Sequence, residues 1–195
     1  MQNKISALGR KLRGRATLQF KFSLSYILVI AAVLILLNSY PLLVSQNLMV
    51  SSTQANLRST AKVIESALMG LEQLTEENVN AALSGLNEAG ATRIMVTDSA
   101  GLVVYDTRQG NDAVGEYALH SVIASALKGS DTFYCRYDGE AVLSRMATPV
   151  VYHSQTVGAV YAYDYDTEQA ALLEGLQTNL MRLSVGIALA VVLLS

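Results

Sequence analysis

The sequence predicts an α+β fold, in which a five-stranded antiparallel sheet with flanking helices is bracketed by transmembrane helices. Three observations support this prediction. A long uncharged run lies near the amino terminus, a second apolar run lies at the other end, and β-rich segments alternate with segments of helical periodicity between them. Of the 195 residues, about 130 remain between the two apolar runs, which is the size of one ordinary domain.

The first apolar run covers residues 22–44 and contains no charged side chain. A helix of this length rises about 1.5 Å per residue and crosses the roughly 30 Å hydrocarbon core of a bilayer. A buried helix of a soluble domain seldom stays uncharged for so long. A signal peptide has a shorter apolar core and a small-residue cleavage site, which Leu43 to Gln46 does not provide. We therefore predict an uncleaved transmembrane helix.

The charges on either side of this run predict its direction. Residues 1–21 carry six basic and no acidic side chains, and such segments stay in the cytoplasm, where they also contact anionic lipid. Residues 45–179 carry all 16 acidic side chains against seven basic ones, a net charge of −9. This domain is expected outside the cytoplasm. Its charge excludes nucleic acid as a partner, because phosphate binding requires a basic surface.

A second apolar run occupies the carboxyl end of the sequence. Residues 183–195 are uncharged, but a helix of that length covers only about 20 Å. We expect the chain to be truncated within a second transmembrane helix. The predicted organisation is a basic cytoplasmic tail (1–21), transmembrane helix 1 (22–44), an extracytoplasmic domain (45–179) and the start of transmembrane helix 2 (180–195).

The segment after the first membrane helix has apolar residues at the spacing 4-3-4-3, which is typical of a helix that packs along a seam. We interpret this stripe as the contact surface of a parallel homodimer. The alternative is that it packs on the sheet of its own domain. The stripe consists of Leu57, Ala61, Ile64, Leu68 and Leu71.

Local signals predict the remaining elements. Thr75 offers an N-cap hydroxyl for a short helix that ends by Gly90, a further helix is expected at residues 116–128, and a last one begins at Asp166. Asp138-Gly139 predicts a two-residue hairpin turn, and Pro149 predicts an edge position or a bulge in its strand. The expected strands are residues 93–98, 102–106, 132–137, 140–151 and 156–165.

Three stretches of the domain together resemble a known family. They read RIMVTDSAGLVVYDT, ASALKGSDTFYCRYDGEAVLSRMATPV and VGAVYAYDYD. The D-S-x-G hairpin with its following Y-D, the A-L-x-G helix end, the A-x-P-V strand and the final V-G-A-V strand are similar to those of the extracytoplasmic PAS-like (single Cache) sensor domains of bacterial sensor histidine kinases. The resemblance covers residues 45–179 and implies a PAS-like fold.

This resemblance also implies a function. The chain would be the sensing portion of a two-component histidine kinase that transmits an extracellular cue across the membrane. The alternatives are the ligand-binding region of a methyl-accepting chemotaxis-type receptor, because chemoreceptors share the domain, and a membrane-tethered interaction domain. A kinase would signal by phosphorelay to a response regulator. ATP and Mg²⁺ would bind only to a kinase domain beyond Ser195, and this chain itself is expected to hold no cofactor.

No catalytic residue is expected in this chain, because the sequence contains no Walker A loop, no G-x-S-x-G and no H-E-x-x-H. The two histidines, His120 and His153, lie in the external domain, and neither is followed by the Glu and Pro of a phosphoacceptor histidine. We interpret both as structural. Cys135 is the only cysteine and is interpreted as a small apolar strand residue.

A candidate ligand site is expected on the later strands. Arg136 and Arg145 lie on neighbouring strands joined by the tight hairpin, so they can converge on one face and bind a carboxylate. The alternative is that these arginines pair with surface acids. The tyrosines expected to line this site are Tyr134, Tyr161 and Tyr163.

A candidate metal site lies next to the last helix. Asp164, Asp166 and Glu168 form an acidic cluster, and carboxylates in such a cluster can bind a divalent cation that bridges to anionic lipid. The alternative is an ordinary solvated helix start, where acidic side chains are favoured by the helix dipole.

Overall fold

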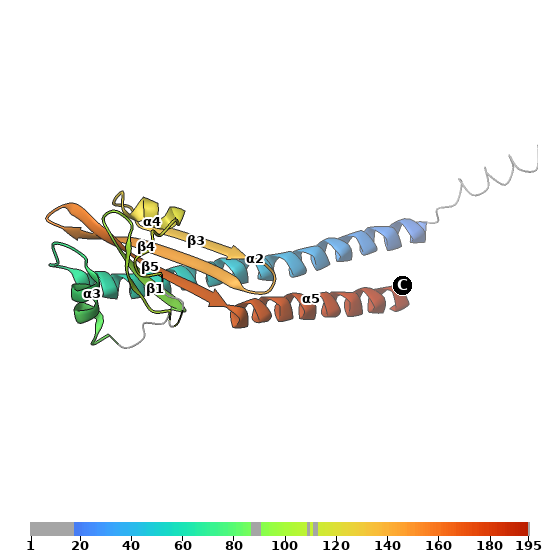
Figure 1. Cartoon of the computed structure of the whole chain (residues 1–195). Coiled ribbons are helices and arrows are strands. Elements are labelled where there is room, and N and C mark those ends of the chain that lie inside the picture. The colour runs from blue at the N-terminus through green and yellow to red at the C-terminus, as the bar shows by residue number, and fades with distance from the viewer. Residues whose placement is uncertain (1–17, 87–90, 109, 111–112, 195) are drawn as a thin grey trace, which may run out of the picture. The chain divides into compact units, whose positions relative to one another are not determined.

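A computed structural model describes residues 18–86, 91–108, 110 and 113–194. The chain divides into two compact units. One unit is Ser45–Glu174, and the other consists of the two end segments, Met1–Val44 and Gly175–Ser195, as far as they are described. Figure 1 shows the order of the elements along the chain.

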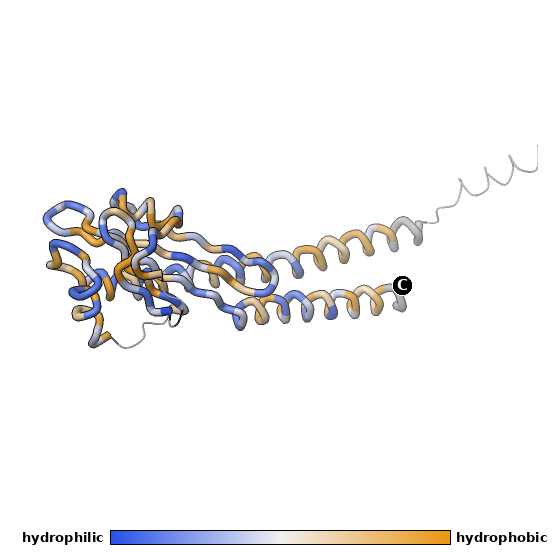
Figure 2. Tube along the Cα trace, in the orientation of Figure 1, coloured by the Kyte–Doolittle hydropathy of each residue, from blue (hydrophilic) through white to orange (hydrophobic). Residues whose placement is uncertain are grey.

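Helix α2 (Leu18–Leu68) is the longest element, with 51 residues. From Phe22 onward it is long and apolar enough to cross a membrane, and its most apolar window has a mean hydropathy of 2.5. Figure 2 shows that apolar residues dominate its amino-terminal half. Among the described residues it is the one helix that meets this criterion. The predicted first membrane span is therefore part of a single helix that continues into the unit Ser45–Glu174.

Five antiparallel strands form one sheet in the order β2-β1-β5-β4-β3. The predicted α+β fold with a five-stranded sheet is confirmed. The longest pairing joins β4 to β5, and β5 lies at the centre of the sheet. The strands are β1 (Arg93–Asp98), β2 (Val103–Asp106), β3 (Thr132–Tyr137), β4 (Val142–Tyr152) and β5 (Gln155–Asp166).

Pro149 lies where the sheet can accept a residue without an N–H. Strand β3 pairs with β4 only as far as Ala147, so the outer edge of β4 is unpaired at Pro149. The β4–β5 register shifts between Val150 and Val151, just before the turn at His153 and Ser154. The predicted edge position and bulge are both found.

The two short helices differ from the sequence prediction in length. Helix α3 (Glu76–Leu83) begins at the predicted cap, where the Thr75 side chain and Asn78 form a capping box. Helix α4 (Ser121–Ala126) is much shorter than the predicted helix at residues 116–128. The prediction is wrong for residues 116–118 because they are extended against β2: Val103 N–H donates to the Glu116 carbonyl and Ala118 N–H donates to the Gly101 carbonyl.

Strand alternation divides the core into two layers, one on each face of the sheet. The α2 face carries Ile94 and Val96 of β1, which pack with α2 and α3. The opposite face carries Met95, which packs with Val122 and Ile123 of α4. We call this second surface the α4 face. Within Ser45–Glu174, α2 and α4 lie on opposite sides of the sheet (Figure 1).

The structure corrects the predicted dimer seam. Leu57, Ala61, Ile64 and Leu68 are at most 2% exposed, and Leu71 packs against the same cluster. Their neighbours are side chains of the sheet and of α3 in the same chain. Leu57, Ala61, Ile64 and Leu68 therefore form the core face of α2 and are not available to a second copy, whereas Leu71 follows the helix and is only partly buried.

Candidate functional site

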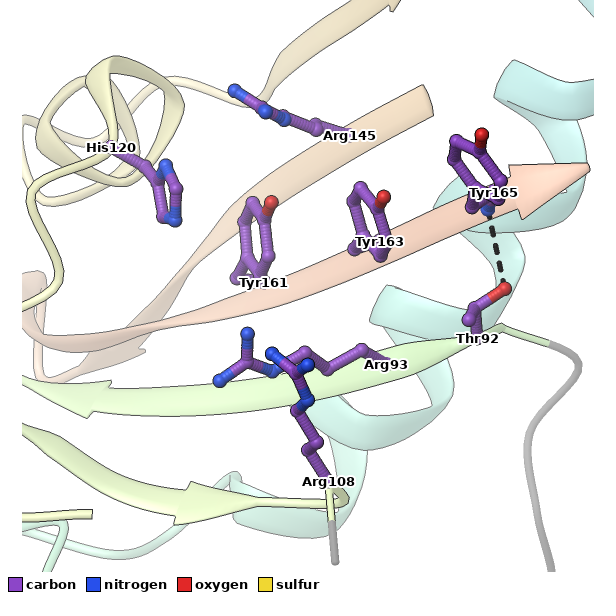
Figure 3. A pocket seen from close by; sticks show the side chains of 8 residues that line it. All are labelled: Thr92, Arg93, Arg108, His120, Arg145, Tyr161, Tyr163 and Tyr165. Carbon is purple, nitrogen blue, oxygen red and sulfur yellow. Dashed lines mark hydrogen bonds between the residues drawn. The ribbon is translucent and has the colours of Figure 1, made fainter. Parts of the chain in front are cut away.

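A pocket of about 490 Å³ opens on the α4 face of the sheet. Figure 3 shows its side chains, which come from β1 and the residue before it, β4, β5, the segment after β2 and the residue before α4. Three arginines and three tyrosines make it both cationic and aromatic. The lining residues are Thr92, Arg93, Arg108, His120, Arg145, Tyr161, Tyr163 and Tyr165.

The strand register brings the key side chains into one row. Arg93 of β1 lies directly opposite Tyr163 of β5, which lies opposite Arg145 of β4, which lies opposite Tyr134 of β3. Residues directly opposite one another in antiparallel strands point to the same face. Tyr161 precedes Tyr163 by two positions and therefore shares that face.

Arg145 carries a polar group that the rest of the chain leaves unsatisfied. Its Nε is buried and has no hydrogen-bond partner among the described residues. Its guanidinium group lies 6.0 Å from the centre of the Tyr134 ring and extends toward His120 (Figure 3). A buried donor without a partner costs about 1–3 kcal/mol. An acceptor on a ligand would remove this cost.

Arg93 is held in place by a buried acid. Its Nε donates to Asp106 Oδ1 at 2.9 Å and its Nη2 donates to Asp106 Oδ2 at 2.5 Å. Asp106, whose side chain is 0% exposed, also accepts the backbone N–H groups of Arg108 and Ala113. This two-point contact fixes the plane of the Arg93 guanidinium group at the wall of the pocket.

The pKa values of this pair reflect the same contacts. Burial alone would raise the pKa of Asp106, but the hydrogen bond from Arg93 and those from Arg108 N–H and Ala113 N–H outweigh it and hold the pKa below its usual value. The hydrogen bond to Asp106 raises the pKa of Arg93 despite its partial burial. Both groups are therefore charged at neutral pH.

His120 stacks on Tyr161 at the inner wall of the pocket. The two rings are parallel within 1°, with their centres 5.3 Å apart. Burial, and then the positive charges of Arg145 and Arg93, lower the pKa of His120. Burial also raises the pKa of the Tyr161 hydroxyl. His120 is therefore neutral and Tyr161 protonated at neutral pH.

The structure brings together some of the side chains predicted as a ligand site and leaves others outside. Arg145, Tyr161 and Tyr163 line the pocket, and Tyr134 lies beside Arg145. Arg136 is exposed on β3 opposite Leu143 and does not line the pocket. Sequence reasoning missed several lining residues, most of them because they depend on distant strand pairing or on the loops, although Tyr165 could have been found from its alternation with Tyr163 on β5. They are Thr92, Arg93, Arg108, His120 and Tyr165.

The predicted metal site is not formed. Asp164 accepts the Thr92 hydroxyl at 2.6 Å, and Asp166 accepts the Gln169 backbone N–H at 2.8 Å as the cap of the last helix. Glu168 is exposed. In the part of the chain that the structure describes, no three His, Cys, Asp or Glu residues are close enough to hold a metal ion. The cluster is an ordinary helix start, which was the alternative interpretation.

Comparisons with known proteins identify the fold. No protein-family model and no curated protein matches the sequence significantly. Among solved structures, the ligand-binding domain of Mlp24 with asparagine is 17% identical, with a TM-score of 0.51 over 74% of this chain and 63% of that one. An extracellular ligand-binding receptor from Desulfohalobium retbaense is 14% identical, with a TM-score of 0.50 over 83% of this chain and 28% of that one.

A third structure is the ligand-binding domain of the Pseudomonas aeruginosa amino acid chemoreceptor PctC in complex with GABA. It is 18% identical, with a TM-score of 0.48 over 65% of this chain and 64% of that one. This chain spans less than two thirds of the length of each of the three structures. The fold of Ser45–Glu174 is that of extracellular sensor domains, as the resemblance to PAS-like (Cache) domains predicts.

Proposed function

We propose that this chain is the sensing part of a transmembrane receptor, and that the pocket on the α4 face binds a small anionic ligand outside the cytoplasm. The sensor-domain fold and the long apolar helix support this proposal. The observation that carries it is the buried, unsatisfied Nε of Arg145 at a pocket that two further arginines line. A carboxylate or similar anion satisfies such a donor and is attracted by the unpaired charge.

The charge balance favours an anion at short range only. Asp106 compensates Arg93, whereas Arg145 and Arg108 form no ion pair with any described residue. The domain as a whole carries a net charge of −9, which repels anions at distances beyond the pocket. We therefore expect affinity to come from direct hydrogen bonds rather than from long-range steering.

The path from the pocket to the membrane supports a signalling role. Tyr161, Tyr163 and Tyr165 lie on β5, and helix α5 (Thr167–Leu194) begins directly after β5 ends. The start of α5 is tied to α2 within the same unit by a hydrogen bond from the Thr53 hydroxyl to the Gln169 side chain, at 3.3 Å. A ligand that moves β5 would therefore shift the start of α5 against α2, as a piston, tilt or rotation.

The type of receptor, and so its signalling output in the cytoplasm, is inferred from the resemblance and is part of the proposal. A two-component sensor histidine kinase is the first candidate, acting on a response regulator, and a chemotaxis-type receptor is the alternative. A homodimer is compatible with either, but its contacts must lie outside the buried stripe of α2. Autophosphorylation of a longer form of the protein with ATP and Mg²⁺ would support the kinase, and its absence would favour the receptor without a kinase domain.

The ligand proposal predicts that small carboxylates stabilise the chain. Thermal melts of residues 1–195 in detergent are recorded with millimolar acetate, succinate, glutarate and sulfate. At a concentration about 100 times the Kd, binding adds about 2.7 kcal/mol to the free energy of unfolding. The melts should show this as a rise in Tm, the ligand-induced shift. We expect Arg145→Ala to abolish this shift, because the variant lacks the free donor.

Arg136→Ala is the matched control. It removes the same side chain from the neighbouring strand, outside the pocket, and should keep the full ligand-induced shift. Each variant is compared with its own melt without ligand. This is necessary because Arg145→Ala removes a buried unsatisfied donor, which by itself changes the Tm of the variant without ligand. Equal shifts in both variants, or no shift with any anion in the wild type, would contradict the proposed site.

The topology proposal can be tested independently of the ligand. A reporter fused after Asn179 should be extracytoplasmic, whereas one placed within residues 1–15 should be cytoplasmic, because the basic tail stays inside. Activity of both reporters on the same side of the membrane would contradict a cytoplasmic amino terminus with an external domain.

A further inference from the structure

His120 is the one lining residue whose charge can change near neutral pH. Its ring is half-buried, lies flat on Tyr161 and faces the guanidinium group of Arg145 (Figure 3). The position directly precedes α4, and the side chain makes no cap hydrogen bond to that helix. The ring is therefore placed by stacking, and its nitrogens are not used in capping the helix.

Charged and titratable groups from every strand that forms the pocket line it together with His120. Strand β4 contributes Arg145, and β1 contributes Arg93, whose charge is compensated by Asp106 at the end of β2. The segment after β2 contributes Arg108. The hydroxyl groups on β5 are those of Tyr161, Tyr163 and Tyr165.

We propose that His120 takes up a proton when an anion binds in this pocket, so that anion binding and acidification reinforce each other. This inference rests on the proposed function and concerns the regulation of the same site. His120 would be a ligand-binding residue as well as the origin of the pH dependence.

The environment of His120 explains the direction of the coupling. Burial, and then the positive charges of Arg145 and Arg93, keep the ring neutral when no anion is bound. An anion placed against Arg145 brings negative charge to the same surface and favours the imidazolium form. The protonated ring has two N–H donors instead of one, and the Tyr161 ring beneath it stabilises the cation.

The sign of the pH effect follows from linkage. If the pKa of His120 is higher with anion bound than without, affinity rises as the pH falls through the bound-state pKa and levels off below the free-state pKa. A difference of one pKa unit corresponds to about a tenfold gain in affinity. Above both pKa values no proton is taken up, and the affinity is independent of His120.

The test uses the full chain, solubilised in detergent. Sulfate is the probe, because its charge is constant from mildly acidic to mildly alkaline pH. The ring signals of labelled histidine are followed by NMR through a pH titration, with and without saturating sulfate. The chain has two histidines, and His153 in the β4–β5 turn serves as an internal reference. We expect sulfate to raise the pKa of His120 by about one unit, whereas the His153 signals should report only the general effect of added salt.

Calorimetry gives a second readout. In buffers of different ionisation enthalpy, sulfate binding at about pH 6 should show net proton uptake. His120→Gln should abolish both the uptake and the gain in affinity at low pH, whereas His153→Gln should keep both. Binding of sulfate with no change at His120 would overturn this inference alone. No binding by sulfate or by any carboxylate of the panel would overturn it together with the proposed function.

Discussion

Gly158→Ala is expected to destabilise the domain more than any other single methyl addition at a described glycine. A Cβ at this position would lie 2.1 Å from the backbone carbonyl oxygen of Thr97 and 2.5 Å from Leu74 Cδ1. The leucine methyl group can move, but the carbonyl belongs to β1, which is paired with β5 at this point. The strands must separate locally, which costs about 3 kcal/mol or more.

Thermal melts of the full chain followed by circular dichroism measure this cost, and a loss of about 10 °C in Tm is expected for a domain of this size. Gly85→Ala is the control, because a Cβ there has no atom of the described residues within 4 Å and needs no positive φ. Its Tm should change by a degree or two at most, corresponding to about 0.5 kcal/mol. Equal Tm values for the two variants would show that β1 and β5 do not approach as closely as described.

The hairpins could be predicted from the sequence because their signals are local. Asp138-Gly139 and the turn at His153 and Ser154 each join strands that are adjacent in the chain, and β3–β4 and β4–β5 pair as expected. Turn chemistry fixes such pairings within a few residues. The pairing of β1 with β5, which places β5 at the centre, has no local signal.

This non-local pairing explains what the sequence revealed of the site and what it did not. Arg145 was found because its hairpin was found. Arg93 was missed because only the β1–β5 register brings it opposite Tyr163. The same hairpin also predicts that Arg136 converges with Arg145, but Arg136 lies on the edge strand, away from the pocket around β5.

The apolar stripe of α2 shows a different limit. A 4-3-4-3 spacing describes any helix that buries one face, and it is equally compatible with a sheet of the same chain and with a second helix. Only the structure shows that Leu57 and Leu68 meet the sheet and α3. The acidic cluster near α5 has the same ambiguity, since capping and metal binding both use carboxylates at helix starts.

Asp106→Asn is the second change with a large expected effect. The substitution keeps the size of the side chain but replaces an acceptor oxygen with an NH₂ group that faces the donors of Arg93. The buried carboxylate makes four hydrogen bonds to Arg93 and to two backbone N–H groups. Removing one partner of a buried ion pair costs about 3–5 kcal/mol, and the partial exposure of Arg93 places the expected loss near the lower value.

Asp131→Asn is the matched control, because Asp131 pairs with Arg58 at 2.8 Å on the surface, where Arg58 is 55% exposed. Exposed pairs contribute about 0–1 kcal/mol, so this variant should unfold at nearly the wild-type urea concentration. A similar loss in both variants would contradict the distinction between the buried and the exposed pair.

The pH dependence separates the electrostatic contribution of Asp106 from packing. Because its pKa is lowered in the folded state, its charge contributes stability that is fully present above the unfolded-state pKa of about 3.9 and is lost as the pH falls through the folded-state pKa. Wild type should therefore lose stability in acid, and Asp106→Asn should lack this part of the decline. Since the same carboxylate orients Arg93 at the pocket wall, the variant should also bind sulfate more weakly at neutral pH, even under conditions where it remains folded. A variant that is destabilised but binds sulfate with wild-type affinity would show that Arg93 makes no contact with the anion, leaving Arg145 and Arg108 as the arginines that hold it.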